Sequence, residues 1–269
     1  MNRRILIGIG MITLLAATLV VAYLLRPPAE ASAPIEAVPL ATQVEAAAVV
    51  EAAKPDQDTT MENETEPEDP PTAPELTAST AGEAQAEEPP AGASLFAISQ
   101  DESEVRFTLD ELLRNVPVTV VGVSNQVAGE IAVDFDNPAN SQVGVILINA
   151  RTLQTDNSFR DRATQNEILD TGTYEFIRFT PTALSGLPAS VTTGDTFSFQ
   201  LSGDLEIRDL TNPVTFEVTL TVAAEDRLEG LGRATVLRSA YDLTIPDVPS
   251  VANVTDEVLL EIEFVALAK

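Results

Sequence analysis

From residue 94 to the end of the chain, apolar and polar side chains alternate with a period of two. The alternation is clearest in residues 196–207, where Phe197, Phe199 and Leu201 are separated by polar side chains. The same pattern recurs in residues 104–109, 130–135, 214–222 and 258–264. A period of two predicts strands with one wet face and one dry face, which is typical of antiparallel sheets.

Clusters of turn-forming residues separate these stretches, for example at residues 136–140, 185–188 and 192–195. Several predicted strands are about ten residues long, whereas the usual length is about five or six. Long strands that follow one another in sequence avoid exposed edges by closing into an up-and-down barrel. We therefore expect an all-β domain over residues 94–269, an antiparallel up-and-down β-barrel, with a two-sheet sandwich as the alternative.

Residues 157–169 interrupt the alternation. Phe159 and Ala163 would share one face of a helix there, and Asp156 or Asn157 could cap its first turn. The interruption predicts a short helix that lies across one mouth of the barrel.

The N-terminal part has a different composition. Residues 1–28 contain no acidic side chain, and residues 5–25 contain no charge at all. As a helix, residues 5–25 would be about 31 Å long and would span a bilayer core. Arg3 and Arg4 before this stretch predict that the N-terminus stays inside and the later residues lie outside the cytoplasm. We expect residues 1–28 to form an uncleaved signal-anchor helix; cleavage near Ala31 is the alternative and would give a secreted protein.

Residues 29–93 are rich in Ala, Pro, Glu and Thr, and their only basic residue is Lys54. Such a composition buries too little apolar surface to offset the entropy cost of ordering. We therefore expect a disordered acidic linker, either a spacer that holds the barrel away from the membrane or a passive connection.

The chain contains no His and no Cys, and its formal net charge is -27. These absences exclude a Ser-His-Asp triad, a His-ligated metal, a disulfide framework and a thiolate nucleophile. The net charge argues against a nucleic-acid partner. Most acidic residues of the domain fall on the polar phase of the alternation, so we expect no enzyme activity, no cofactor and no metal site.

The order of short motifs resembles that of the YceI-like proteins over nearly all of residues 95–267. The motifs are Ser103-x-Val105-x-Phe107, Val120-x-Gly122, Gly129-x-Ile131, Thr155-Asp156-Asn157-x-x-Arg160-Asp161, Tyr174-x-x-Ile177-x-Phe179, Gly203-x-Leu205-x-Ile207 and Thr211-x-Pro213-Val214. The resemblance implies a lipocalin-like barrel, usually exported, whose apolar cavity binds long amphiphiles such as polyisoprenoids or isoprenoid quinones. The chain departs from the family at Glu102 and Asp110, where the family often has His, and at Ala240 and Asp242.

On this basis we expect an amphiphilic lipid as the ligand, the membrane as a second partner through the N-terminal helix, and no nucleic acid; the oligomeric state stays open. The residues expected to line the cavity are Phe107, Leu109, Val120, Val133, Phe135, Leu147, Phe159, Phe179, Phe197, Phe199, Leu201, Phe216 and Phe264. The residues expected at a headgroup-binding rim are Thr155, Asn157, Arg160, Asp161 and Tyr241. The alternatives are a solid core for the first set and, for the second, an Arg-Asp pair that pins a loop. A solid barrel would suit a stalked adhesion or scaffolding module.

Overall fold

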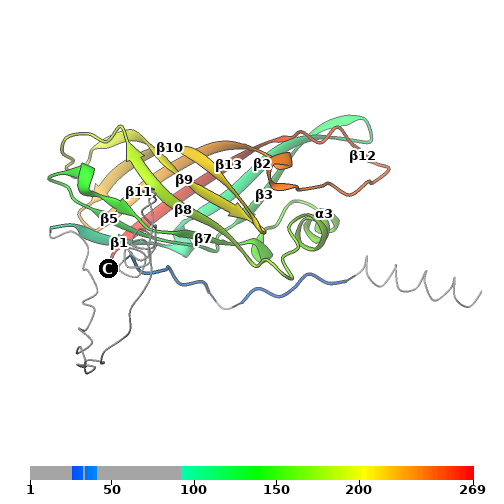
Figure 1. The fold of residues 1–269 in the computed structure, drawn as a ribbon, viewed down its shortest axis with the longest axis horizontal. Helices are drawn as coiled ribbons and strands as arrows, with labels where there is room; N and C mark the ends of the chain where they lie inside the picture. The colour runs from blue at the N-terminus through cyan, green and yellow to red at the C-terminus, as the bar shows by residue number, and fades with distance from the viewer. Residues whose placement is uncertain (1–25, 33, 41–91) are drawn as a thin grey trace, which may run out of the picture.

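The computed structural model describes residues 26–32, 34–40 and 92–269 (Figure 1). Most of the expected signal-anchor, residues 1–28, and most of the expected linker, residues 29–93, therefore lie outside the described residues. Within the described ranges, no helix is both long enough and apolar enough to cross a membrane.

The described residues form one antiparallel sheet of thirteen strands. The strands are β1 (Ser94–Ile98), β2 (Glu104–Leu113), β3 (Val116–Ser124), β4 (Val127–Ala128), β5 (Glu130–Val133), β6 (Gln142–Val143), β7 (Ile146–Asn149), β8 (Phe176–Ser185), β9 (Thr196–Ile207), β10 (Leu210–Ala224), β11 (Arg227–Leu237), β12 (Val251–Ala252) and β13 (Glu257–Ala268). The expectation of an all-β, antiparallel domain is confirmed.

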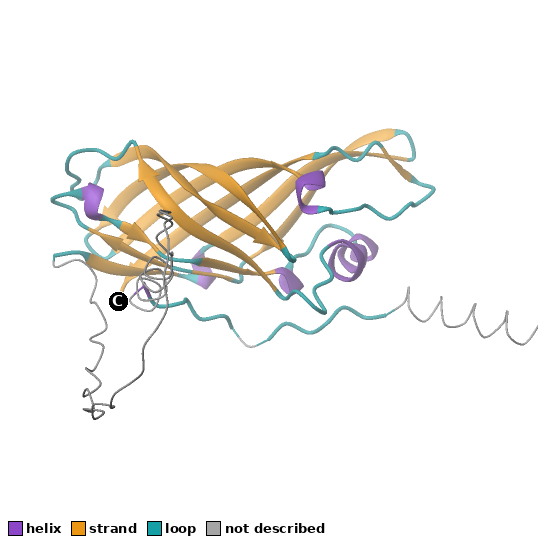
Figure 2. Ribbon diagram, in the orientation of Figure 1, coloured by secondary structure: helices purple, strands orange, loops and turns teal. Residues whose placement is uncertain are grey.

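The sheet curls until its two ends meet in one segment of chain. Strands β7, β8, β9, β10 and β11 pair in sequence order, and β11 is followed by β13, β1 and β5. At one end of this order β4 pairs with β7, at the other β5 pairs with β1, and only Gly129 separates β4 from β5. The result is the elongated curled sheet of Figure 2, which has the form of a lipocalin-like barrel and not that of a two-sheet sandwich.

One end of the curled sheet carries the hairpin of β2 and β3, the short strand β12 and the helix α3 (Ser158–Ala163) (Figure 1). The side-chain Oδ1 of Asn157 accepts hydrogen bonds from the backbone N–H groups of Phe159 and Arg160, so Asn157 caps α3 as the sequence predicts. One π-helical turn, Thr164–Ile168, continues the helix. Short 3-10 turns occupy Gln100–Glu102, Pro138–Asn140, Ala150–Thr152 and Arg238–Tyr241.

Residues 26–32 and 34–40, which we call the strap, lie along the outside of the curled sheet (blue in Figure 1). Ile35 and Leu40 are buried, and Ile35 packs with Ala128, Val145 and Leu147. The composition of residues 29–93 predicts no fixed structure, but this first part of the segment has apolar side chains that match an apolar strip on the sheet. The contact is local, so the average composition of the segment conceals it.

Polar contacts hold the strap at both ends of its apolar patch. The backbone N–H and the hydroxyl of Ser32 donate to Oε1 of Glu175. Farther along, the backbone N–H of Leu40 donates to Oε2 of Glu130, at 2.9 Å, and Nζ of Lys269 lies 2.7 Å from the other oxygen of the same carboxylate. Glu130 is nearly buried, so these partners compensate for the desolvation of its charge.

The contact between Ser32 and Glu175 predicts that part of the strap detaches in acid. Burial alone would raise the pKa of Glu175, but the hydrogen bonds from Ser32 and the charge of Arg151 lower it below its usual value. A carboxylate with a lowered pKa stabilises the folded state above its unfolded pKa, and this contribution is lost as the pH falls through the lowered value. We expect the Ser32 amide to be protected from hydrogen exchange at neutral pH and to lose that protection well below the usual glutamate pKa of about 4.3.

The matched variant for this test is Glu175→Gln. It keeps an oxygen that accepts from Ser32 but cannot titrate, so any remaining protection should no longer depend on pH. Protection of Ser32 that is equally strong in acid in the natural chain would contradict the prediction.

Candidate functional site

The curled sheet encloses two adjoining apolar chambers. The inner chamber has a volume of about 160 Å³ and the outer chamber a volume of about 320 Å³. Their walls share Phe107, Leu153, Ile177, Ile207 and Leu260, so the two spaces are neighbours along the length of the sheet. Pockets that bind small molecules in proteins typically have about 300–1,000 Å³, mostly with apolar walls.

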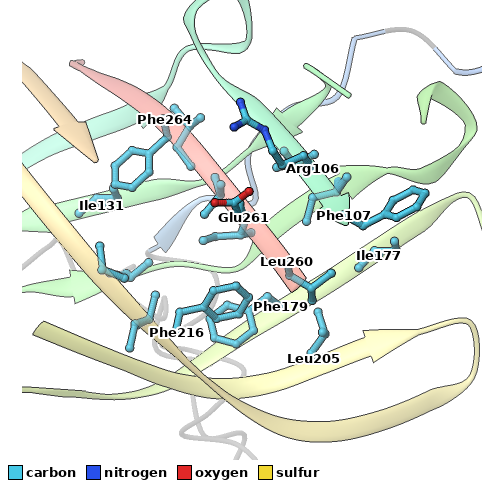
Figure 3. A pocket seen from close by; sticks show the side chains of 18 of the residues that line it. Arg106, Phe107, Ile131, Ile177, Phe179, Leu205, Phe216, Leu260, Glu261 and Phe264 are labelled. Atoms are coloured by element: carbon cyan, nitrogen blue, oxygen red, sulfur yellow. The ribbon is translucent and has the colours of Figure 1, made fainter. Parts of the chain in front are cut away.

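The inner chamber is lined almost entirely by aliphatic and aromatic side chains from strands that face one another (Figure 3). Arg106 and Glu261 are the charged residues among those described that contribute to its wall. Each has an ionic partner elsewhere: Arg106 pairs with Glu104 at 2.7 Å, and Glu261 pairs with Arg233 at 2.7 Å. The inner chamber therefore suits an apolar chain and offers no free charge to a headgroup.

Glycines on neighbouring strands leave room for three inward phenylalanine rings. Phe107 pairs with Gly122 across β2 and β3, and Phe264 pairs with Gly230 across β13 and β11. A Cβ atom at either glycine would overlap with the ring of its partner. These rings therefore lie against the backbone of the next strand, in space that any larger residue would occupy, and the middle of the sheet stays hollow.

A third ring follows the same principle on β8. The ring of Phe179 lies where a Cβ atom at Gly203 of β9 would be, since that atom would come within 2.6 Å of Cζ of Phe179. Phe179 also packs edge-on against Phe216, with the ring centroids 5.1 Å apart. Such an arrangement fixes the ring at the wall and keeps it from turning freely into the chamber.

The outer chamber lies between β2, α3 and the residues that follow β11. Its wall contains a buried ion pair: Nη2 of Arg160 on α3 lies 3.0 Å from Oε1 of Glu111 on β2. The side chains of Arg160 and Glu111 are 19 % and 7 % exposed, and Arg160 also pairs with Asp156. The pair fastens α3 to the sheet and adds charged groups to a wall that is mostly apolar but also contains Asn157 and Arg238.

Tyr241 adds an aromatic side chain to the outer chamber. It is 2 % exposed, and its hydroxyl oxygen is shielded from solvent, so the ring and not the hydroxyl forms the wall. Burial raises the pKa of Tyr241 to about 12, so the hydroxyl keeps its proton at neutral pH. Tyr241 thus contributes apolar surface to this end of the molecule.

The structure places most of the expected cavity residues in a chamber wall. These are Phe107, Leu109, Val120, Phe159, Phe179, Phe199, Leu201, Phe216 and Phe264. Val133, Phe135 and Phe197 are instead part of, or packed against, the hydrophobic core outside the two chamber walls. Phe159 lines the outer chamber although the residue is 76 % exposed, which puts it at the opening.

Leu147 was expected to line the cavity, but its side chain lies on the opposite face of the sheet. Leu147 packs on the outside of the sheet with Ile35 of the strap, whereas its neighbours Ile146 and Ile148 line the inner chamber. All four residues from 145 to 148 are apolar, so the sequence pattern does not show which of them face the inside of the sheet and which face the outside. The strap is the physical reason why the outer phase is apolar too.

The expected rim residues divide into two groups. Asn157, Arg160 and Tyr241 line the outer chamber. Thr155 and Asp161 lie outside the chamber walls, because Oδ1 of Asp161 accepts hydrogen bonds from the backbone N–H and the hydroxyl of Thr155. The alternative of an Arg-Asp pair is therefore half right: Asp161 pins a loop, but Arg160 pairs with Glu111 and Asp156 instead.

Glu111 is the site residue that the sequence analysis missed. The inward alternation of Val105, Phe107 and Leu109 continues to Glu111 and Leu113, so a carboxylate occupies an inward position of β2. An acidic residue on the apolar phase of a strand was the available signal, and it requires a buried partner. Arg160 could not be identified as that partner, because 49 residues separate the two in sequence.

We expect Gly230→Ala to reduce the space inside the sheet. The added Cβ displaces the Phe264 ring toward the inner chamber, and such overpacking costs about 1–3 kcal/mol of folding free energy. Uptake of an apolar fluorophore should fall by more than the loss of stability explains. Gly232→Ala is the matched control on the same strand, because the atom nearest to its Cβ would be a methyl carbon of Ile262 at 3.0 Å and the nearest ring atom, in Phe216, would be 3.9 Å away. Equal uptake by both variants would contradict the role of Gly230.

We expect Arg160→Ala to destabilise the fold by about 3 kcal/mol, because it leaves the buried carboxylate of Glu111 without its partner. The double variant Arg160→Ala/Glu111→Leu should recover most of this loss, since it removes both charges. Chemical denaturation of the single and double variants measures the coupling. Additive losses in the double variant would show that the pair does not fasten α3.

Comparisons with known proteins place this architecture in a family. A family model described as the YceI-like domain matches residues 96–266. No curated protein matches the chain. Among solved structures, a polyisoprenoid binding domain from Saccharophagus degradans, implicated in plant cell wall breakdown, is similar with 12 % identity and a TM-score of 0.51, over 65 % of this chain and 98 % of that one.

Two further solved structures are similar at low identity. BcnA of Burkholderia cenocepacia is 19 % identical with a TM-score of 0.49, over 62 % of this chain and 98 % of that one. The YCEI protein of Campylobacter jejuni is 16 % identical with a TM-score of 0.43, over 53 % of this chain and 81 % of that one. The family model matches more than half of the length of this chain, so the chain belongs to the YceI-like family.

Proposed function

We propose that this chain binds and carries an amphiphilic lipid without transforming it. The observation that carries the proposal is the pair of adjoining apolar chambers along the inside of the curled sheet. Burial of a long apolar chain there would contribute about 25 cal/mol for each Å² removed from water. The similar domain from Saccharophagus degradans is described as polyisoprenoid binding, which supports a polyisoprenoid or isoprenoid quinone as the class of ligand.

The ligand would lie with its apolar chain in both chambers and its head at the outer one. The charged groups of the inner chamber belong to Arg106 and Glu261 and are paired, whereas the wall of the outer chamber contains two guanidinium groups, those of Arg160 and Arg238. A guanidinium can donate to phosphate or carbonyl oxygens in a planar fork. A headgroup with such oxygens would compete with Glu111 for Arg160.

The proposed place of action is the outer side of a membrane. The uncharged residues 5–25, preceded by Arg3 and Arg4, support an N-terminal anchor with the barrel outside the cytoplasm. An anchored carrier would keep its ligand close to the bilayer from which such lipids come.

The alternative of an adhesion or scaffolding module requires a solid interior, and the two chambers argue against it. Enzyme activity finds little support in the lining. Glu111 is the carboxylate of the outer chamber and Glu261 that of the inner one, and each is held by an arginine. We therefore favour binding without catalysis.

The test compares two tryptophan variants of the full chain. Val218 lines the inner chamber, so Val218→Trp should fill that chamber and abolish most lipid binding. Val133 is also buried but lies outside the chamber walls, so Val133→Trp should reduce the stability of the fold without reducing lipid binding. Lipids that copurify with each protein are identified by mass spectrometry after extraction. The proposal predicts a prenyl lipid enriched on the natural chain and on Val133→Trp, and lost from Val218→Trp. Absence of any enriched amphiphile on the natural chain would refute it.

A further inference from the structure

We propose that the strap docks the curled sheet with the opening of its outer chamber against the bilayer surface. The inference rests on the membrane anchor of the proposed function, and it adds an interaction surface and its partner. It replaces the picture of a barrel held away from the membrane by a long spacer.

The strap begins beside the outer chamber. The backbone carbonyl of Arg26 accepts a hydrogen bond from Nδ2 of Asn166, at 2.8 Å. Asn166 belongs to the π-helical turn after α3, and its neighbours Thr164 and Ile168 line the outer chamber. The uncharged stretch of the sequence ends at residue 25, and consecutive Cα atoms are about 3.8 Å apart. An anchor that ends at residue 25 would therefore end beside the opening of the outer chamber.

From that opening the strap runs along the sheet to its opposite end (Figure 1). Nη1 of Arg151 donates to the carbonyl of Glu30, and Nε2 of Gln100 donates to the carbonyl of Ile35. The strap ends at Leu40, bonded to Glu130, at the end of the sheet opposite α3 (Figure 1). The chain from residue 26 to residue 40 can reach at most about 50 Å. Because hydrogen bonds to Asn166 and to Glu130 hold its two ends, the docked strap limits the distance of both ends of the sheet from residue 26.

Residues 41–91 are flanked in sequence by two described segments that contact the same strand, β5. Leu40 is bonded to Glu130 of β5, and Ser94 at the start of β1 pairs with Val133 of β5. Because the described residues on both sides of this segment are bonded to β5, the segment does not stand between the sheet and an anchor that ends at residue 25. The length of the acidic segment therefore does not set the distance to the membrane while the strap is docked.

Exposed apolar side chains lie at this end of the sheet. Phe159 on α3 is 76 % exposed, Val116 at the start of β3 is 59 % exposed, and Val248 before β12 is 41 % exposed. The backbone N–H of Arg114 donates to the carbonyl of Ser250, which joins the β2–β3 hairpin to the segment that carries Val248. Phe159 and Val248 line the outer chamber, and Val116 pairs across the hairpin with Leu113 of the same wall. These exposed apolar side chains lie at the same end of the sheet as the predicted end of the anchor, and they fit the acyl region of a bilayer.

The experiment uses the absence of cysteine in the chain, so that one introduced thiol gives one label. The variants Val116→Cys and Ser158→Cys place an environment-sensitive fluorophore near the opening, and Asp226→Cys places it in the turn between β10 and β11, beside the far end of the strap. Each full-length protein is reconstituted in phosphatidylcholine vesicles that contain doxyl-labelled phosphatidylcholine as a quencher. We expect strong quenching at positions 116 and 158 and almost none at position 226.

Strap variants test whether the docking sets this orientation. Ile35→Asp and Leu40→Asp place a charge in the buried apolar contact and should abolish most of the quenching at positions 116 and 158. Pro39→Asp adds the same charge at an exposed strap position and should leave the quenching unchanged. Circular dichroism of each variant establishes that the sheet is still folded.

The outcomes separate this inference from the proposed function. Protein that fails to float with the vesicles refutes the anchor itself. Protein that floats but is quenched equally at positions 158 and 226 refutes the orientation, whether or not a lipid copurifies with it. Quenching that persists in Ile35→Asp and Leu40→Asp refutes the role of the strap.

Discussion

The hollow interior depends on glycines that receive inward phenylalanine rings. Gly122 and Gly230 give Phe107 and Phe264 a place against the backbone of the neighbouring strand, so these large side chains form walls and do not fill the middle. The interior of a small barrel of about eight strands is otherwise just wide enough to be filled by its own side chains. The proposed binding of a lipid depends on these pairs, in which the phenylalanine ring occupies the space of the side chain that the glycine lacks.

On the outside of the sheet, one contact, between Ile35 of the strap and residues 145–148, explains a second feature of the sequence. Residues 145–148 are apolar on both faces because the inner phase lines a chamber and the outer phase receives Ile35. The strap therefore covers apolar surface that would otherwise face water, and it does so with residues that precede the acidic segment. The same contact would couple the position of the anchor to the position of the opening, with α3 held there by Arg160 and Glu111.

The alternation of apolar and polar residues was enough to predict the antiparallel sheet, the short helix and its cap, because these features depend on local pattern. The motif order added the family, which the family model confirms, and the class of ligand, which stays a proposal. Three features could not be predicted. The side on which Leu147 packs depends on the strap, the partner of Glu111 lies 49 residues away, and the ring positions depend on which glycine pairs with which phenylalanine across the sheet. Each is set by a contact between residues that are distant in sequence.

The central claim, a hollow sheet that holds an apolar chain, is tested most directly by a crystal structure of the full chain saturated with a long-chain prenyl alcohol. The account predicts continuous density for one apolar chain through both chambers, with the rings of Phe107 and Phe264 still lying against Gly122 and Gly230. Rings turned into the middle of the sheet, with no density for the alcohol, would contradict it.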